Sequence, residues 1–138
     1  MKGRFYTLTT MLAESAGLSC SCQIGDVVTS LYNDDILLHF MLDEESENTI
    51  IQVAVGIVPC HNKDILFEKL LQWNTMLSQA HGFSYSLHEG DVITLQGVIS
   101  MQNADDEYTL SVFTHFVQEY VHSLENIESF LQDLALSA

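Results

Sequence analysis

The sequence predicts an α+β fold, in which a twisted antiparallel sheet is packed by three helices in a single domain. Apolar residues recur with helical spacing in three segments, and they alternate with polar residues in the segments between. Short polar or glycine-containing turns link consecutive strands, which favours hairpins and therefore antiparallel pairing. A chain of 138 residues has the size of one domain and can bury roughly two-thirds of its unfolded surface. The predicted domain therefore spans residues 1–138.

The first part of the chain predicts one helix followed by a run of strands. Residues 3–16 form the helix, because apolar residues share one face and Gly17 offers a C-terminal stop. Alternation then predicts strands over residues 18–24, 27–32, 36–42 and 49–58, with turns at Gly25-Asp26, Asn33-Asp34 and residues 43–48. The first two of these strands could also be one long bent strand.

The second part predicts a helix, a hairpin and a long final helix. Asn62 is a suitable N-cap for a helix over residues 63–80, and Gly82 ends it. A turn at Glu89-Gly90 joins two strands over residues 83–88 and 91–101. Asn103 or Asp105 caps the final helix. The order of elements is therefore α-β-β-β-(β)-α-β-β-α.

The final helix carries a long apolar stripe with the spacing of a heptad repeat. The stripe contains Leu110, Phe113, Val117, Tyr120, Leu124, Ile127, Leu131 and Leu134. Further apolar residues lie off the stripe, at Val112, Phe116, Val121 and Phe130. This apolar surface is wider than one sheet face needs, so we expect part of it to contact a partner.

The charge balance excludes several kinds of partner. Four basic residues stand against nineteen acidic ones, for a formal charge of -15, and no Lys or Arg follows Lys69. Nucleic-acid binding depends on Lys and Arg contacts to phosphate, and anionic membranes would repel the chain. No apolar run is long enough to span a membrane. The N-terminal residues imitate a signal peptide, but Glu14 within the apparent cleavage site argues against one. Three cysteines fit a reducing cytoplasm.

Catalytic and metal-binding patterns are missing from the sequence. Cys20 and Cys22 point the same way from one predicted strand, yet a second pair with zinc-ligand spacing is absent. His115 and His122 lie about two helical turns apart, too far to share one ion. No nucleophile elbow, P-loop or dinucleotide fingerprint occurs. We therefore predict no catalytic residues, no metal and no cofactor.

Several short segments resemble class I type III secretion chaperones of the Tir chaperone-like family. They are Cys20-Ser21-Cys22-Gln23-Ile24-Gly25-Asp26, Leu70-Leu71-Gln72-Trp73-Asn74, Gly82, Glu89-Gly90 and Phe113-x-x-Phe116-Val117. The small size, the acidity and the order of elements also match that family. The chain departs from it at His81-Gly82, where the family often has two glycines, and at Gln102-Asn103, where it often has proline and leucine.

The resemblance implies a homodimer in the bacterial cytoplasm of a pathogen or symbiont, without enzymatic activity. The dimer would hold the N-terminal segment of a secreted effector soluble, partly unfolded and competent for secretion. The resemblance implies a dimer interface at Leu66, Leu70, Trp73, Leu77, Phe83 and Tyr85. It implies an effector-binding surface at Phe5, Leu8, Leu12, Val28, Leu31, Ile36 and Leu38.

Two other functions remain open from the residues alone. A small α+β enzyme such as a hot-dog-like thioesterase would also pair a long helix with an antiparallel sheet, with His39, His88, Asp91 or Glu119 as a base. A passive oligomerisation domain would use the final helix as a coiled coil through Leu124 and Ile127.

Overall fold

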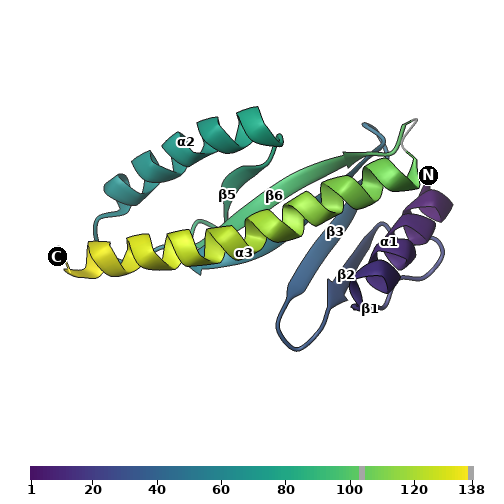
Figure 1. The fold of residues 1–138 in the computed structure, drawn as a ribbon, viewed down its shortest axis with the longest axis horizontal. Coiled ribbons are helices and arrows are strands. Elements are labelled where there is room, and N and C mark those ends of the chain that lie inside the picture. Colours follow the sequence, from purple (N-terminus) through teal and green to yellow (C-terminus); the bar gives the residue numbers. More distant parts are fainter. Residues whose placement is uncertain (103–104, 137–138) are drawn as a thin grey trace. The chain divides into compact units, whose positions relative to one another are not determined.

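The computed structural model describes residues 1–102 and 105–136 and confirms the α+β prediction (Figure 1). In chain order the elements are α1 (Lys2–Ala16), β1 (Ser19–Cys20), β2 (Val28–Tyr32), β3 (Leu37–Asp43), β4 (Asn48–Ile57), α2 (Lys63–Ala80), β5 (Ser84–His88), β6 (Val92–Ser100) and α3 (Asp106–Leu136). Within the described residues the strands form a six-stranded antiparallel sheet with the order β1-β2-β3-β4-β6-β5.

The chain divides into two compact units. Unit 1 comprises residues 1–53 and 98–114, and unit 2 comprises residues 54–97 and 115–138. Three elements, β4, β6 and α3, pass from one unit into the other. The single domain expected for residues 1–138 stays a prediction.

The core of unit 1 forms where α1 packs against β1 and β3 (Figure 1). The apolar face of α1 is buried, together with the inward side chains of the strands: Phe5, Leu8, Leu12, Leu31, Leu38, Phe40, Leu42 and Ile51. The Phe40 ring lies 6.2 Å from the Phe113 ring at the start of α3. Gly17 ends α1 in the left-handed conformation, and the Leu18 N–H donates to the Ala13 carbonyl over 2.8 Å.

The core of unit 2 is rich in aromatic rings. Phe83 and Phe116 meet edge to face, with their centroids 5.4 Å apart, and both are buried. Trp73 on α2 lies 6.0 Å from the Tyr85 ring and 5.6 Å from the Phe130 ring. These contacts connect α2, β5 and the second half of α3.

The predicted strand over residues 18–24 is wrong beyond Cys20. The Gln23 N–H donates to the Asp26 carboxylate over 2.9 Å, and the Asp26 N–H donates to the Gln23 carbonyl over 3.1 Å. This turn ends the strand early and leaves the Ile24 side chain 77% exposed. The alternation of polar and apolar residues therefore continued past the point where strand pairing stops.

The helix boundaries agree with the prediction to within one residue, but the side-chain cap predicted for α2 does not form. Asn62 precedes α2 with a left-handed backbone (φ 60°), and its side chain makes no capping hydrogen bond to the described helix. At α3 the Tyr108 N–H donates to the Asp105 carboxylate over 2.8 Å, so Asp105 is a side-chain cap as predicted. Asn103, the other predicted cap, lies outside the described residues.

The buried face of α3 coincides with the predicted stripe at Phe113, Ile127 and Leu134 and is rotated from it at other positions. Its most buried positions are Thr109, Phe113, Phe116, Ser123, Ile127 and Leu134. The predicted stripe residues Leu110, Val117, Leu124 and Leu131 are only half-buried. Ser123 can occupy a buried position because its hydroxyl pairs with the Tyr85 hydroxyl over 2.5 Å.

Candidate functional site

Strand pairing in unit 1 builds a sheet face that α1 and α3 leave open. In β2 and β3, Val28 pairs with Met41, Ser30 with His39 and Tyr32 with Leu37. Met41 and His39 then pair with β4, opposite Ile50 and Gln52. Because side chains alternate across a strand, these residues face away from the buried Leu38, Phe40 and Ile51. The open sheet face therefore consists of Val28, Ser30, Tyr32, Leu37, His39, Met41, Ile50 and Gln52.

Large apolar side chains on this face are exposed. Val28 is 58% exposed, Leu37 49%, Met41 44% and Tyr32 42%. Two apolar rows, Val28–Met41–Ile50 and Tyr32–Leu37, flank a polar row in which the Ser30 hydroxyl lies 3.1 Å from His39 Nδ1. Paired side chains on neighbouring strands touch, so each row is a continuous apolar surface. Contiguous apolar patches of this kind on soluble proteins mark sites of partner or ligand binding.

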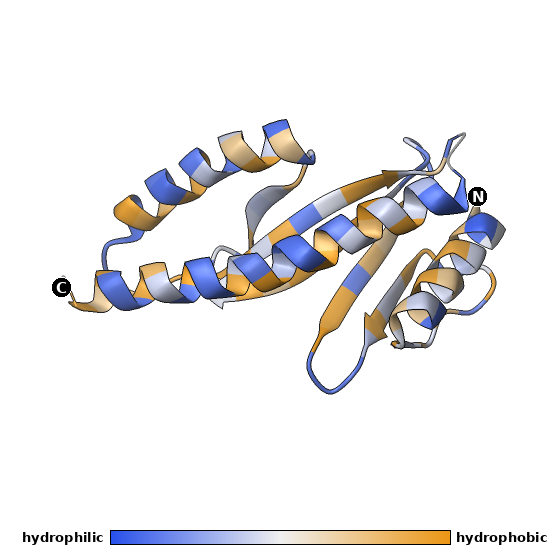
Figure 2. Cartoon of the chain, viewed as in Figure 1, coloured by the Kyte–Doolittle hydropathy of each residue, from blue (hydrophilic) through white to orange (hydrophobic). Residues whose placement is uncertain are grey.

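The strand β3 supplies this face because it is hydrophobic on both sides. Figure 2 shows β3 coloured as hydrophobic over most of its length, beside a hydrophilic loop that joins it to β2. Leu38, Phe40 and Leu42 fill the core, which leaves Leu37 and Met41 pointing outward. A strand with only one buried face would carry polar residues at those outward positions.

An open strand edge adjoins the face. The short strand β1 pairs with β2 only at Leu31 and Tyr32. From Val28 to Ser30, the outer edge of β2 has no neighbouring strand in the described part of the chain. Such an edge presents unpaired backbone N–H and C=O groups, which can pair with an extended segment of another chain.

The predicted effector-binding residues are mostly internal. Phe5, Leu8, Leu12, Leu31 and Leu38 are buried in the core of unit 1. Val28 lies on the open sheet face, and Ile36 is half-buried in the loop before β3. The role of this set in effector binding stays a prediction, and only Val28 and Ile36 offer surface without repacking. The sequence did not single out Tyr32, Leu37 and Met41, because β3 is apolar on both faces and its sequence does not show which face the helices cover.

The predicted dimer-interface residues also contribute to a core, that of unit 2. Leu66, Leu70, Leu77, Phe83 and Tyr85 are buried, and Trp73 is half-buried with the Lys69 ammonium 5.4 Å from the centre of its ring. The dimer interface itself stays a prediction. Large apolar side chains on α2 that do reach the surface are Ile65, Leu71 and Met76, which are 46%, 68% and 67% exposed.

The side chain of Asn74 protects the outer edge of the sheet at β5. Its amide oxygen accepts from the Tyr85 N–H over 2.5 Å, and its amide nitrogen donates to the Tyr85 carbonyl over 3.1 Å. The Asn74 amide therefore occupies both hydrogen-bonding groups of Tyr85, as a neighbouring strand would. This edge is blocked at Tyr85, whereas the outer edge of β2 is open.

The ionisable residues considered as catalytic bases do not form a recognisable site. His39 contacts Ser30 on the open sheet face. The His88 imidazole lies 3.9 Å from the Glu89 carboxylate at the β5–β6 turn, and the Asp91 N–H donates to the His88 carbonyl there. Glu119 lines a separate small cavity of about 130 Å³ with Trp73 and Tyr85. Burial raises the pKa of the Tyr85 hydroxyl, and the hydrogen bond to Ser123 partly offsets this.

Within residues 1–102 and 105–136, no group of three or more His, Cys, Asp or Glu side chains could hold a metal ion. None of the helices described is both long enough and apolar enough to cross a membrane.

Several solved structures share this fold at low sequence identity. The chain resembles a chain of the ExsC–ExsE complex at 15% identity, with a TM-score of 0.71 and coverage of 91% of this chain and 94% of that one. It resembles a chain of the HopA1–SchA chaperone–effector complex at 14% identity, with a TM-score of 0.68 and coverage of 88% and 94%. For the Yersinia pestis type III secretion chaperone SycH with a YscM2 fragment, the identity is 16%, the TM-score 0.60 and the coverage 86% and 98%.

Comparison with sequences identifies the family. No curated protein matches the chain by sequence. Residues 9–124, however, match the family model of the Tir chaperone protein (CesT) family. This match covers most of the chain, from the middle of α1 to the second half of α3, and so includes every strand of the sheet. The chain therefore belongs to the Tir chaperone protein (CesT) family.

Proposed function

We propose that the chain is a type III secretion chaperone of the bacterial cytoplasm. It binds the N-terminal segment of a secreted effector and keeps that segment soluble, partly unfolded and competent for secretion. The observation that carries this proposal is the open sheet face, with its exposed apolar rows beside the open edge of β2. Membership of the Tir chaperone family and the similarity of the fold to a chain of a chaperone–effector complex support it.

The geometry suits an unfolded client rather than a folded one. An extended segment can pair with the β2 edge through its backbone, which requires no particular sequence of the client. Alternate side chains of that segment would then reach the Val28–Met41–Ile50 row, which selects for apolar residues. Backbone pairing thus provides affinity, and the open sheet face provides selectivity.

The strong negative charge supports a chaperone role in a second way. Exposed apolar rows on a small protein promote self-association, because burying them is favourable. A formal charge of -15 makes copies of the chain repel one another before these rows meet. A client with positive charge would be attracted by the same field.

The proposal is tested by identifying what the protein retains. Native purification from the source bacterium, followed by mass spectrometry, should find a polypeptide segment from the N-terminal region of a secreted protein. Met41→Glu places a charge within an apolar row and should lower retention of that segment at least tenfold, which corresponds to about 1.4 kcal/mol. Tyr108→Glu is the matched control, because Tyr108 is also exposed, at 45%, but lies on α3. Equal retention by wild type and Met41→Glu would contradict the assignment of the site.

We also propose that the chaperone acts as a homodimer, with α2 at the interface. The exposed Ile65, Leu71 and Met76 flank the buried stripe of α2 and would supply its apolar contacts. The predicted interface residues would pack directly beneath this surface and hold it in place. They are Leu66, Leu70, Trp73, Leu77, Phe83 and Tyr85. A dimer would give one effector segment two copies of the open sheet face.

A further inference from the structure

Two cysteines stand close together in unit 1, at the point where β1 ends. Cys20 is the last residue of β1, and Cys22 follows two residues later, before the turn at residues 23–26. The Cys22 N–H donates to Cys20 Sγ over 3.4 Å, so the backbone of one cysteine touches the sulfur of the other. Both thiols are free and half-buried. The two residues are called the Cys20–Cys22 pair below.

The bend in the chain after Cys20 allows the two sulfurs to bond. A disulfide requires Cβ atoms about 3.5–4.5 Å apart, whereas residues two apart in an extended strand are separated by about 6.8 Å. The chain must therefore leave the strand between the two cysteines, and here strand pairing does stop at Cys20. Cys22 Sγ lies 3.8 Å from the Gln23 carbonyl oxygen. Rotation about the Cα–Cβ bond of Cys22, from one staggered position to another, moves this sulfur toward Cys20 Sγ.

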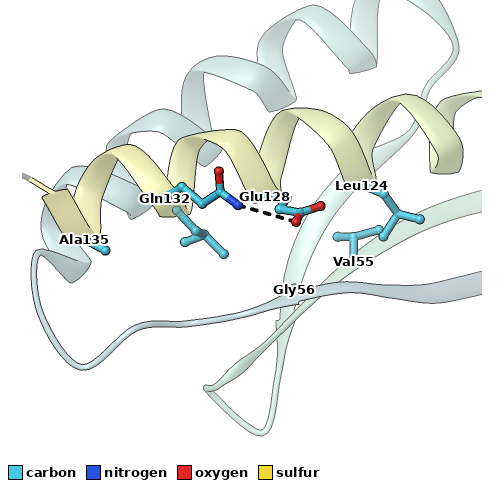
Figure 3. Close-up of a pocket in the computed structure, with 7 residues that line it drawn as sticks. Val55, Gly56, Leu124, Glu128, Gln132 and Ala135 are labelled. Carbon is cyan, nitrogen blue, oxygen red and sulfur yellow. Dashed lines mark hydrogen bonds between the residues drawn. The ribbon is translucent and has the colours of Figure 1, made fainter.

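The Cys20–Cys22 pair lies at the edge of the sheet, within reach of small molecules. Cys20 Sγ is 3.7 Å from the hydroxyl of Thr29 on β2. By contrast, an open groove of about 450 Å³ in unit 2, between α3 and the end of β4, is lined by side chains such as Val55, Leu124 and Glu128 (Figure 3). Among the described residues, no Cys or His lines that groove. The thiol pair is therefore a separate feature of the surface, with reactive groups that the groove does not have.

The position of the pair connects it to the open edge of β2. The strand β1 pairs with β2 only through Ser19 and Cys20. Continuing the same register would place residues 21 and 22 opposite Ser30 and Thr29, so an extended segment there would cover the open edge. The bend after Cys20 keeps this segment off β2. A bond between the two sulfurs would fix the bend, because the bridge cannot form in an extended strand.

We propose that the Cys20–Cys22 pair is a redox-active dithiol that closes to a disulfide by exchange with a small-molecule disulfide, such as glutathione disulfide, and then holds the β2 edge open. One protein thiolate attacks a sulfur of glutathione disulfide, which forms a mixed disulfide and releases one glutathione thiolate. The other protein thiolate attacks the protein sulfur of the mixed disulfide, which forms the Cys20–Cys22 bond and releases the second glutathione thiolate.

This exchange is balanced and reversible. The two protein thiols are oxidised, glutathione disulfide is reduced to two molecules of glutathione, and the two thiol protons pass to the released thiolates. Excess glutathione in a reducing cytoplasm reopens the bridge, which is the behaviour of redox-sensing disulfides in that compartment. The chemistry is independent of the proposed function, whereas its effect on a client at the β2 edge rests on that function.

Incubation of the full chain with glutathione disulfide tests the pair. Remaining thiols are then blocked with N-ethylmaleimide, the protein is digested with pepsin, and the peptides are identified by mass spectrometry. The peptide that contains Cys20 and Cys22 should carry the internal bridge, in an amount at least tenfold greater than its glutathione adducts. Cys60 is exposed and lies outside the pair, so it should carry glutathione or the blocking group instead.

Variants with one cysteine replaced locate the bond. Cys20→Ser and Cys22→Ser should each accumulate a glutathione adduct on the remaining cysteine of the pair, because no second thiol is there to displace it. Cys60→Ser is the matched control, since it makes the same substitution outside the pair and should form the bridge as the wild type does. Circular dichroism verifies that each variant is folded. Adducts in the wild type at the level of Cys22→Ser, or loss of the bridge in Cys60→Ser, would overturn the proposal.

Amide hydrogen exchange tests the effect of the bridge on the strand edge. Residues 28–30 should exchange at least as fast in the bridged protein as in the reduced protein. Slower exchange after bridging would overturn this part of the proposal, since the segment would then have closed on β2.

The outcomes separate this inference from the proposed function. If the bridge forms but no effector segment is ever retained, the redox inference stands and the proposed function fails. If no bridge forms while Met41→Glu still loses the effector segment, the reverse holds.

Discussion

Replacing Gly97 by alanine tests the packing of unit 2 directly. Gly97 lies on β6, and a Cβ atom there would come within 3.0 Å of both Phe116 Cδ2 and Phe83 Cδ1. The two rings already pack edge to face and are almost completely buried. Neither ring can swing into solvent, so the added methyl group must displace one of them.

The expected cost follows from two opposing effects. Forcing an extra methyl group into a well-packed core costs about 1–3 kcal/mol. Replacing glycine within a strand recovers about 0.5–1 kcal/mol, because alanine loses less conformational entropy on folding. We therefore expect Gly97→Ala to lower the free energy of unfolding by about 1–2 kcal/mol. At about 3 °C per kcal/mol for a chain of this size, the melting temperature should fall by about 3–6 °C.

Urea denaturation followed by circular dichroism and by Trp73 fluorescence measures the change. Gly3→Ala is the matched control: Gly3 lies in α1, and a Cβ atom there would meet nothing within 4 Å. That variant should be as stable as wild type, or more stable by up to about 1 kcal/mol. Trimming the ring with Phe83→Leu should make Gly97→Ala less costly than it is in the wild type. If Gly97→Ala proved as stable as Gly3→Ala, the packing argument would be wrong.

Three further predictions concern α2 and β5. Asn74→Ala removes two hydrogen bonds to the Tyr85 backbone and should lower the free energy of unfolding, measured with urea, by about 1–3 kcal/mol. Gln72→Ala, at an exposed site on α2, is the control and should change it little. Equal losses of stability in the two variants would contradict the edge role of Asn74. Burial raises the pKa of Tyr85, so the stabilisation from its protonated form is complete below about pH 10 and is lost as the pH rises through the raised value. Denaturation midpoints should fall more steeply at alkaline pH in wild type than in Tyr85→Phe, and parallel profiles would refute this. Leu71→Glu should convert the proposed dimer to a monomer in light scattering, and an unchanged mass would exclude this face of α2 as the interface.

The positions of the helices and most strands could be predicted from the sequence because their signals are local. The apolar period of 3.6 or two residues and the turn residues at Gly17, Gly82 and Glu89-Gly90 depend only on neighbouring parts of the chain. The helix predicted over residues 63–80 agrees with α2 at both ends. Strand pairing is a different matter. Residues 18–24 alternate correctly, yet only Ser19 and Cys20 find a partner strand.

The choice of exposed face in β3 required the tertiary structure. Leu37, Leu38, Phe40, Met41 and Leu42 are all apolar, so their sequence could not tell which face the helices cover. The buried Ser123 on α3 shows the same effect, since a hydroxyl belongs in a core only where Tyr85, remote in sequence, offers a partner.

The sequence by itself determined the class of fold, the strong negative charge and the absence of familiar catalytic motifs. The tertiary structure decided which apolar side chains are core and which remain as surface, and so it located the open sheet face. The physical reason is that periodicity arises within one segment, whereas burial depends on which distant segments pack against it.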